Sequence, residues 1–264
     1  MSSRSIRRKY GQNYLVDKAI LFEMANHVSA KENDSFIEIG PGMGALTDLI
    51  NINNVNVTAI DIDENNIKAL KTKFIGPAVF NFINEDILNY EIEGMDLRVV
   101  GNLPYNISTQ IILKLLDNVN QIIDMHFLVQ KEVALKITGN VSTKNWGKLA
   151  IKIAAFYDSE ILFDVPPEAF DIKPKVTSSF IRLIPKKNLN FSNTSKKNLF
   201  ALIDLAFASR RKNIKNNLKK LNINWAKVDI DPTKRPEELT LESFIKLSEE
   251  MKNLNQKAKE AGVL

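Results

Sequence analysis

The sequence contains no cysteine and only two histidines, His27 and His126, among its 264 residues. Disulfide bonds, thiolate metal sites and cysteine nucleophiles are therefore excluded, and so is a metal site rich in histidine. No apolar run approaches the roughly 18 residues that a membrane helix needs. The segment Met1–Gly11 also lacks the apolar core of a secretory signal. We therefore expect a cytoplasmic protein that works without a metal ion.

Positive charge is concentrated toward the C-terminus. Residues 185–264 carry 17 Lys and Arg against 9 Asp and Glu, a net charge of +8. Residues 1–184 carry 19 against 22, a net charge of −3. The hydrophobic share of 44% and the charged share of 25% are those of an ordinary globular protein. We expect a catalytic body followed by a basic unit that binds a polyanion such as a nucleic acid.

Segments typical of strands and of helices alternate over the first two-thirds of the chain. The expected strands are Ser35–Ile39, Val55–Ile60, Ala78–Ile83, Leu97–Gly101 and Met125–Val129. The helical patterns around them cover Asp17–Val28, Ala45–Asn51, Glu64–Phe74, Thr109–Leu116 and Lys131–Thr138. Alternation of this kind predicts an α/β fold in which helices cover a mostly parallel sheet.

Two further strands and a helical tail follow. A helix over Lys148–Phe156 precedes two β-rich runs, Ser159–Asp164 and Thr177–Leu183, which we expect to form an antiparallel edge. The polar run 185–195 breaks both periodicities, so we predict one domain of residues 1–184 and a small all-helical domain of residues 185–264. The tail helices are expected over Lys197–Phe207, Arg211–Lys220 and Leu241–Met251, the last with Thr240 as its N-cap.

A glycine-rich turn follows the first expected strand. Gly40 and Gly42 allow the backbone to turn tightly and to approach a ligand that a Cβ atom would obstruct. Together with Ala45 they also satisfy the spacing of a dinucleotide-binding loop. The glycines alone therefore leave a nicotinamide cofactor and a methyl donor equally open.

Carboxylates end the next two strands. Asp61 ends the second strand, about twenty residues after the glycines, where a carboxylate can accept both ribose hydroxyl hydrogens of a nucleoside. Asp86 follows the third strand and could accept from an adenine amino group, whereas Asp63 fits the N-cap of the next helix. Because parallel strands share one carboxyl edge, Gly40, Asp61 and Asp86 predict a single crevice.

The run Asn102-Leu103-Pro104-Tyr105 ends the fourth strand at the same edge. Methylation of an adenine N6 atom needs acceptors for the amino hydrogens, because the nitrogen lone pair is otherwise delocalised into the purine ring. The Asn102 side-chain oxygen and the Leu103 carbonyl can supply them, with Leu103 held extended by the proline that follows. Tyr105 offers a face for an extruded base. This chemistry favours a methyl donor and needs no metal ion.

The segment Asn102–Thr109 resembles the signature of the ribosomal RNA adenine N6-dimethyltransferases. That family includes the small-subunit enzymes tied to kasugamycin sensitivity, the large-subunit erythromycin-resistance enzymes, and eukaryotic and mitochondrial relatives. Other family motifs are resembled by Lys9–Leu15, Glu38–Thr47, Val129–Val133, Val165–Phe170, Pro174–Val176, Ala206–Lys212 and Arg235–Leu239. The resemblance implies a Rossmann-like class I methyltransferase sheet and S-adenosylmethionine as cofactor, and we expect a monomer.

The resemblance also implies roles for individual residues. Tyr105 and Phe170 would enclose the target adenine between their rings. Three places depart from the family pattern. Tyr14 stands where the family usually has Phe, Asp61 stands where it usually has Glu, and Asp171–Lys173 lacks a proline common in the family, so we expect a looser loop there. The shorter carboxylate should still reach the ribose, with a different affinity. The methyl donor would contact Asn13, Leu15, Gly40, Asp61, Asp86 and Asn102.

Basic side chains are expected to hold the RNA. Some lie in an N-terminal arm just before Asn13, and others begin a series at largely helical spacing that continues to Lys220. Such phosphate contacts set the affinity and its salt dependence rather than the choice of sequence. The expected RNA-binding residues are Arg7, Arg8, Lys9, Lys131, Arg210, Arg211 and Lys212.

Together these features predict an enzyme that dimethylates two adjacent adenines in a loop of small-subunit ribosomal RNA while the subunit assembles. One alternative is the same chemistry on large-subunit RNA. Another, from a different class, is a ribosome-assembly factor without catalytic activity. The intact set from Gly40 to Tyr105 argues against this last alternative, because a pure binding module need not keep both halves of a reactive site.

Overall fold

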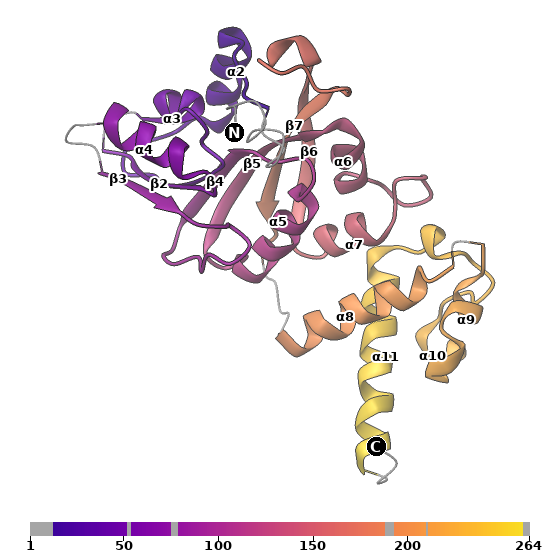
Figure 1. The fold of residues 1–264 in the computed structure, drawn as a ribbon. Helices are drawn as coiled ribbons and strands as arrows, with labels where there is room; N and C mark the ends of the chain where they lie inside the picture. The colour runs from indigo at the N-terminus through magenta and orange to yellow at the C-terminus, as the bar shows by residue number, and fades with distance from the viewer. Residues whose placement is uncertain (1–12, 52–53, 75–78, 188–192, 210, 261–264) are drawn as a thin grey trace. The chain divides into compact units, whose positions relative to one another are not determined.

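The computed structural model describes residues 13–51, 54–74, 79–187, 193–209 and 211–260 (Figure 1). The chain divides into two compact units, one formed by Met1–Leu135 with Tyr157–Pro185 and the other by Lys136–Phe156 with Lys186–Leu264. The predicted boundary after residue 184 lies next to the observed break after Pro185.

Residues 136–156 belong to the second unit, whereas the sequence predicts them within a first domain of residues 1–184. The indole N–H of Trp146 donates to the Leu239 carbonyl over 2.8 Å. The N–H of Lys186 donates to the Phe156 carbonyl over 2.9 Å. These contacts join residues 136–156 to residues of the tail that are far away in the sequence. No local pattern in the sequence predicts such contacts.

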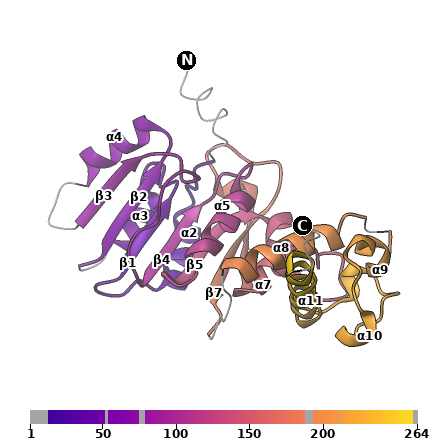
Figure 2. The same ribbon diagram turned by 90° about the horizontal axis from the view of Figure 1, so that it is seen from below.

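Seven strands in the described residues form one sheet: β1 (Ser35–Ile39), β2 (Asn56–Asp61), β3 (Val79–Asn84), β4 (Leu97–Asn102), β5 (Ile122–Gln130), β6 (Tyr157–Val165) and β7 (Ser178–Pro185). Their order is β3-β2-β1-β4-β5-β7-β6, and Figure 2 shows the first five side by side. Those five pair in parallel, while β7 pairs antiparallel with β5 and with β6. The predicted mostly parallel sheet with an antiparallel edge is confirmed.

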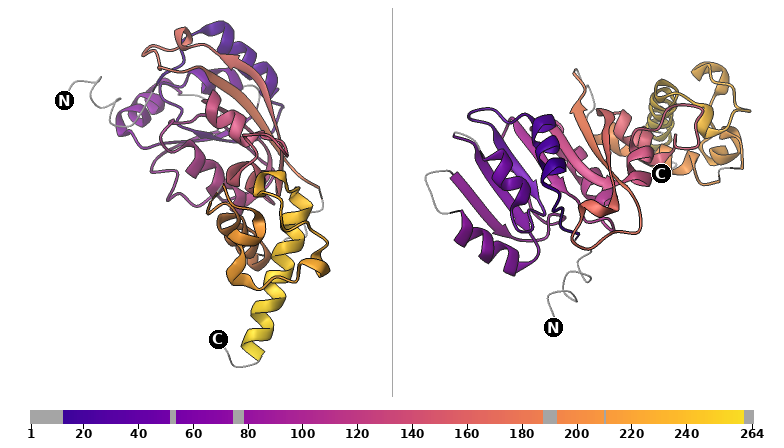
Figure 3. Two further views of the ribbon diagram at one scale, coloured as in Figure 1. Left: turned by 90° about the vertical axis from the view of Figure 1, so that its right-hand side faces the viewer. Right: turned by 90° about the horizontal axis from the view of Figure 1, so that it is seen from above.

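Helices cover both faces of this sheet (Figures 2 and 3). They are α2 (Lys18–Val28), α3 (Ala45–Ile50), α4 (Glu64–Lys73), α5 (Ser108–Leu115) and α6 (Lys131–Ile137). Buried side chains of α2, α3 and α4 share one core cluster with Phe36 of β1 and Val57 of β2. The β1-to-β2 and β4-to-β5 connections run in opposite directions along the sheet, so right-handed crossovers place α3 and α5 on opposite faces.

The strand order reverses between β1 and β4, the position at which open α/β sheets bind ligands. These two strands pair with Ile39 opposite Gly101. A Cβ atom at Gly101 would lie 2.4 Å from the Ile39 carbonyl oxygen, so only glycine permits this approach of the two backbones. The carboxyl ends of the parallel strands meet at one edge of the sheet, as the sequence predicts.

The second unit is helical, and Figure 3 shows most of it in orange and yellow. Its helices are α7 (Lys148–Ala154), α8 (Asn193–Ala206), α9 (Ile214–Asn217), α10 (Trp225–Val228) and α11 (Leu241–Glu260). Thr240 is confirmed as the N-cap of α11, since its hydroxyl oxygen accepts the Ser243 N–H over 3.3 Å. In the described parts of the chain, no helix is long and apolar enough to cross a membrane.

The prediction of one continuous helix over Arg211–Lys220 is wrong. Helix α9 begins only at Ile214, because the Asn213 side chain accepts the Asn216 N–H over 2.9 Å and caps the helix there. After one turn it gives way to a 3-10 turn over Lys219–Leu221. The basic residues of this segment therefore do not lie along one continuous helical face.

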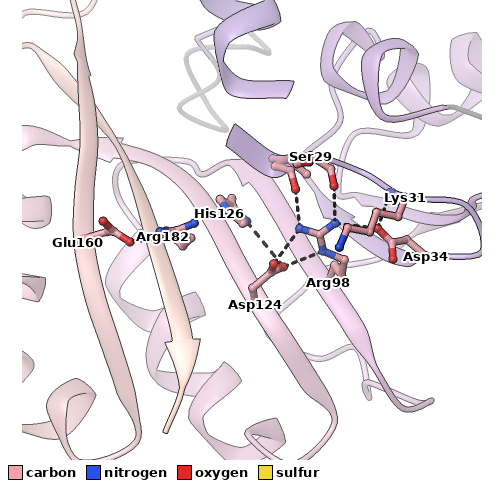
Figure 4. A network of polar contacts seen from close by, with 9 residues as sticks. Ser29, Lys31, Asp34, Arg98, Asp124, His126, Glu160 and Arg182 are labelled. Atoms are coloured by element: carbon pink, nitrogen blue, oxygen red, sulfur yellow. Dashed lines mark hydrogen bonds and ion pairs between the residues drawn. The ribbon is translucent and has the colours of Figure 1, made fainter. Parts of the chain in front are cut away.

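A buried arginine fastens α2 to the other edge of the sheet, at the amino ends of β4 and β5 (Figure 4). Arg98 donates a bidentate pair to Asp124 over 3.0 and 2.7 Å and a third hydrogen bond to Asp34 over 2.7 Å. Its remaining N–H groups reach the carbonyls of Val28 and Ser29. Because its side chain is only 9% exposed, the charge depends on these partners.

His126 lies next to this network on β5 and is 1% exposed. Neither ring nitrogen has a hydrogen-bond partner among the described residues, and Asp124 Oδ1 lies 3.7 Å from Nδ1. Burial lowers the pKa of His126 to about 4; the charges of Arg98 and Arg182 act in the same direction, and Asp124 opposes them. The fold therefore holds this ring neutral where an unfolded chain would protonate it.

We predict that His126 makes the fold sensitive to acid. Between pH 6.5 and pH 4 the unfolded chain binds a proton that the folded chain does not. The free energy of unfolding therefore falls with the pH over this range, by about 3 kcal/mol at most. The variant His126→Leu should lose this part of the pH dependence, measured by urea unfolding across the range. Parallel curves for the wild type and the variant would contradict the assignment.

Candidate active site

A cavity of about 220 Å³ opens at the carboxyl ends of the parallel strands. It is lined by residues from the loops after β1, β2, β3 and β4 and from the segment before α2. Eight residues of the predicted site meet in it: Asn13, Gly40, Asp61, Asp86, Asn102, Leu103, Pro104 and Tyr105. The sheet thus brings together side chains that are far apart in the sequence.

The glycine-rich loop after β1 forms one wall of the cavity. Gly40 and Gly42 have φ angles of 67° and 56°, in the left-handed region that favours glycine. A Cβ atom at Gly42 would lie 2.9 Å from Cε1 of Tyr14, so the tyrosine ring rests directly on the loop backbone. Tyr14 therefore belongs to this wall, although the sequence motifs do not assign it a role.

Asp61 ends β2 and is 4% exposed. Its Oδ1 accepts the Asp63 N–H over 2.9 Å, and its Oδ2 accepts the Asn66 side-chain amide over 2.8 Å and the Gly42 N–H over 3.3 Å. Burial raises the pKa of Asp61, and these hydrogen bonds oppose the rise. A carboxylate has about four acceptor positions, so about one remains for a ribose hydroxyl, where the sequence predicts two. Asp63 caps α4 through the Asn65 N–H, as predicted.

Asp86 follows β3 and lines the cavity. Its Oδ1 accepts the Leu88 N–H over 2.9 Å, so the carboxylate also caps the turn that it begins. Lys114 of α5 holds the same turn, because its ammonium donates to the carbonyls of Ile87, Leu88 and Tyr90 over 2.8, 2.9 and 2.6 Å. The position of Asp86 therefore depends on a side chain from a distant helix.

A second cavity of about 320 Å³ adjoins the first and shares Tyr14, Gly40 and Asn102 with it. Leu15 lines this second cavity and not the first. Glu38 also lines it, is 2% exposed, and accepts the Thr47 hydroxyl over 2.5 Å. Burial raises the pKa of Glu38 to about 7. A cationic group bound beside this carboxyl would favour its ionised form.

The loop after β4 lines the first cavity with Asn102, Leu103, Pro104 and Tyr105. The Asn102 side-chain nitrogen donates to the Asn13 carbonyl over 2.8 Å, which leaves the amide oxygen as an acceptor. Leu103 is 1% exposed, and its N–H donates to the Leu128 carbonyl over 3.1 Å. The carbonyl of Pro104 accepts a further N–H and closes a turn. Both the amide and the backbone of this loop are thereby held in one orientation.

Tyr105 lines the same cavity and is held at the tip of its ring. Its hydroxyl lies 2.5 Å from Oγ of Ser178, the first residue of β7, which is fully buried. Burial raises the pKa of Tyr105, so the hydroxyl stays protonated at neutral pH. The hydrogen bond fixes the ring of a residue expected to stack on the target base.

Phe170 lines neither of the two cavities. Its ring is 3% exposed and belongs to the core cluster, and its backbone forms an antiparallel bridge with Leu15. The structure thus does not bring Phe170 into the cavity beside Tyr105. Enclosure of an adenine between the two rings would require Phe170 to leave this core position.

The residues predicted to bind RNA are described only in part. Lys131 begins α6, and its ammonium pairs with Asp164 of β6 over 2.5 Å, a partner that the sequence does not reveal. An RNA phosphate would have to compete with this carboxylate. Arg211 and Lys212 are exposed ahead of α9. The other four, Arg7, Arg8, Lys9 and Arg210, lie outside the described residues.

The sequence motifs predict no role for several residues that shape the site. Each contacts the site through a partner far away in the sequence: Tyr14, Asn66, Lys114 and Ser178. The one local signal is at Tyr14, which departs from the phenylalanine usual in the motif it occupies. Within the described ranges, no group of three or more His, Asp or Glu side chains could hold a metal ion.

Comparison with known proteins connects this geometry to a family. The family model for "Ribosomal RNA adenine dimethylase" matches residues 3–253. A "Ribosomal RNA small subunit methyltransferase A" from Coxiella burnetii is 37% identical over 255 residues, covering 94% of this chain and 98% of the relative. A protein of the same name from Legionella pneumophila is 39% identical over 254 residues, covering 94% and 99%.

Solved structures agree with this relationship. A dimethyladenosine transferase from Plasmodium falciparum has a TM-score of 0.80 and 25% identity over 91% of this chain and 98% of its own. The 23S ribosomal RNA methyltransferase ErmE, at 23% identity, has a TM-score of 0.72 over 91% and 100%, and shares the fold. The predicted Rossmann-like methyltransferase sheet with a helical C-terminal part is thereby confirmed. By the match along nearly its whole length, the chain belongs to the ribosomal RNA adenine dimethylase family.

Proposed function

We propose that this protein uses S-adenosylmethionine to dimethylate the N6 amino groups of adenines in small-subunit ribosomal RNA. The observation that carries the proposal is the meeting of two half-sites in one cavity. Gly40, Asp61 and Asp86 suit a nucleoside, and the loop Asn102–Tyr105 offers acceptors for an amino group. The two curated relatives, both named for the small subunit, support the choice of substrate.

The walls of the two cavities fit S-adenosylmethionine. Asp61 keeps an acceptor for the ribose, and Asp86 offers a carboxylate to the adenine amino group. The buried Glu38 carboxyl in the adjoining cavity suits the cationic amino group of the methionine part. Leu15 lines that same cavity, whereas Asn13 would contact the donor from the first cavity. When bound, the cofactor supplies an electrophilic methyl group and leaves as a neutral thioether.

Asn102 and Leu103 would prepare the adenine for attack. The amide oxygen and the Leu103 carbonyl accept the two amino hydrogens, which frees the N6 lone pair from conjugation with the ring. While N6 gains the methyl group it would become positively charged, and these two oxygens would stabilise that charge until the N6 proton passes to water. Because the Asn102 nitrogen is engaged with Asn13, the amide keeps its oxygen toward the substrate.

Tyr105 would stack on the adenine after the base has left its own helix. Extrusion limits the substrate to unstacked loop bases, since the A-form major groove is too narrow for side chains. We further propose that the enzyme acts as a monomer in the cytoplasm, on the immature small subunit. The basic residues of the N-terminal arm and the tail would hold the surrounding RNA through its phosphates.

The variant Asn102→Ala should lower the rate of methyl transfer by about 100-fold or more, because it removes an acceptor that acts on the reacting nitrogen. The assay is transfer of radiolabelled methyl from S-adenosylmethionine to immature small subunits and to naked large-subunit RNA. The product should be N6,N6-dimethyladenosine in the small subunit. Binding of S-adenosylhomocysteine shows whether the variant still has an intact donor site.

The other outcomes of this assay identify the alternatives. Label on large-subunit RNA alone would replace the proposed substrate while keeping the chemistry. No label on either RNA, with RNA binding intact, would favour an assembly factor without catalytic activity.

Ser178→Ala should lower kcat about three- to tenfold by releasing the Tyr105 ring, with little change in the KM for the methyl donor. Tyr105→Phe removes the same hydrogen bond from its other end and should cause a similar loss, while the double variant should lose no more. Steady-state kinetics of all three variants provides the test. Losses that multiply in the double variant would show that the two hydroxyls act separately.

Replacing both Arg211 and Lys212 with Gln should weaken RNA binding and flatten its salt dependence. Each lost phosphate contact lowers the slope of log K against log salt by roughly 0.7 to 0.9. Filter binding at several salt concentrations measures the slope. Lys68→Gln is the control, since this exposed lysine on α4 already pairs with Glu64. Unchanged binding by the double variant at every salt concentration would remove these residues from the RNA interface.

A further inference from the structure

We propose that Tyr14 and Asn66 are positioning residues for the methyl donor, because together they hold the Asp61 carboxylate in the orientation that binds the ribose. The inference rests on the proposed function, which assigns Asp61 to the donor's ribose. It adds two residues that the family motifs do not assign to the donor, one in the segment before α2 and one on α4.

A chain of hydrogen bonds connects the three side chains. The Tyr14 hydroxyl donates to Asn66 Oδ1 over 2.9 Å, and Asn66 Nδ2 donates to Asp61 Oδ2 over 2.8 Å. The direction of these hydrogen bonds is fixed at Asp61, because a carboxylate can only accept. An amide turned the other way would set its oxygen against the carboxylate oxygen, so Asn66 must donate to Asp61 and accept from Tyr14.

These hydrogen bonds determine which oxygen of Asp61 is available to a ribose hydroxyl. Oδ2 already accepts from Asn66 and Gly42, whereas Oδ1 accepts only from Asp63 among the described residues. With about two acceptor positions on each oxygen, Oδ1 is the one left for a ribose hydroxyl. Of the three donors, only Asn66 is a side chain, so it is the contact to Asp61 that a substitution can remove.

Tyr14 is itself fixed, so it can act as an anchor for the chain. Its ring rests on the backbone of Gly42. Its N–H donates to Asp171 Oδ1 over 3.1 Å, and its carbonyl accepts the Asp171 N–H over 3.0 Å. The segment before α2 thus reaches the ribose-binding carboxylate through a side chain, in addition to the contact that Asn13 makes with Asn102.

The same contacts account for two departures from the family pattern. Asp61 is one methylene shorter than the glutamate usual at this position, so it has less reach and depends more on being held correctly. Tyr14 replaces a phenylalanine, which would have no hydroxyl to orient Asn66. Asn66 is 4% exposed, so without that hydroxyl its buried oxygen would lose a partner and the amide would turn.

The variants Tyr14→Phe and Asn66→Ala should each raise the Kd for S-adenosylhomocysteine about three- to tenfold, the effect of losing one hydrogen bond. Titration calorimetry on the full chain gives this Kd without RNA or turnover. In steady-state assays the KM for S-adenosylmethionine should rise by a similar factor while kcat stays within about twofold. Because both residues act through Asp61, the double variant should bind no more weakly than Asn66→Ala alone.

Tyr157→Phe is the matched control, because Tyr157 is 1% exposed and its hydroxyl has no hydrogen-bond partner in the described parts of the chain. It should leave the Kd unchanged. Thermal unfolding of each variant separates a loss of stability from a loss of affinity. An unchanged Kd in folded Tyr14→Phe, or losses that multiply in the double variant, would overturn the proposal. Failure of the wild type to bind S-adenosylhomocysteine would instead overturn the proposed function.

Discussion

The approach of β1 to β4 is the constraint on which the whole site depends. At Gly101 the two backbones come so near that any side chain would collide with the Ile39 carbonyl, and a glycine is the physical requirement for pairing there. This pairing puts Gly40 and Asn102, the residues that follow, next to each other. The glycine loop after β1 and the loop Asn102–Tyr105 after β4 therefore meet where the strand order reverses.

The segment before α2 completes what the strands begin. The Asn13 carbonyl orients the Asn102 amide, the Tyr14 ring covers Gly42, and the backbone of Leu15 forms a bridge with Phe170. Each contact fixes a group that would otherwise have several orientations of similar energy. Fixed orientations matter for a methyl transfer without a metal ion, because its rate depends on holding the acceptors and the reacting atoms in one geometry. Far from the chemistry, the Arg98 network fixes the other end of α2 to the sheet.

Much of the fold could be predicted because its signals are local. The β-rich runs, the glycines at positive φ and the N-caps Asp63 and Thr240 all depend on neighbouring residues. The helix predicted over Arg211–Lys220 is broken by a local contact, because the Asn213 side chain caps a new helix at Ile214. Distant partners decide other features of the fold. Trp146 joins residues 136–156 to the second unit, and Asp164 pairs with Lys131.

The sequence by itself determined the reaction class. The glycine turn after β1 and the loop Asn102–Tyr105 are short motifs that can be read directly from the sequence, and they identify the family. It also determined the parallel sheet, since strand and helix periodicities are local. Only the tertiary structure decided which acceptors of Asp61 stay open, that Phe170 lies in the core, and that Ser178 holds Tyr105. The physical reason is that these hydrogen bonds and this burial depend on which segments lie close together in space. Local sequence patterns do not predict which distant segments come together.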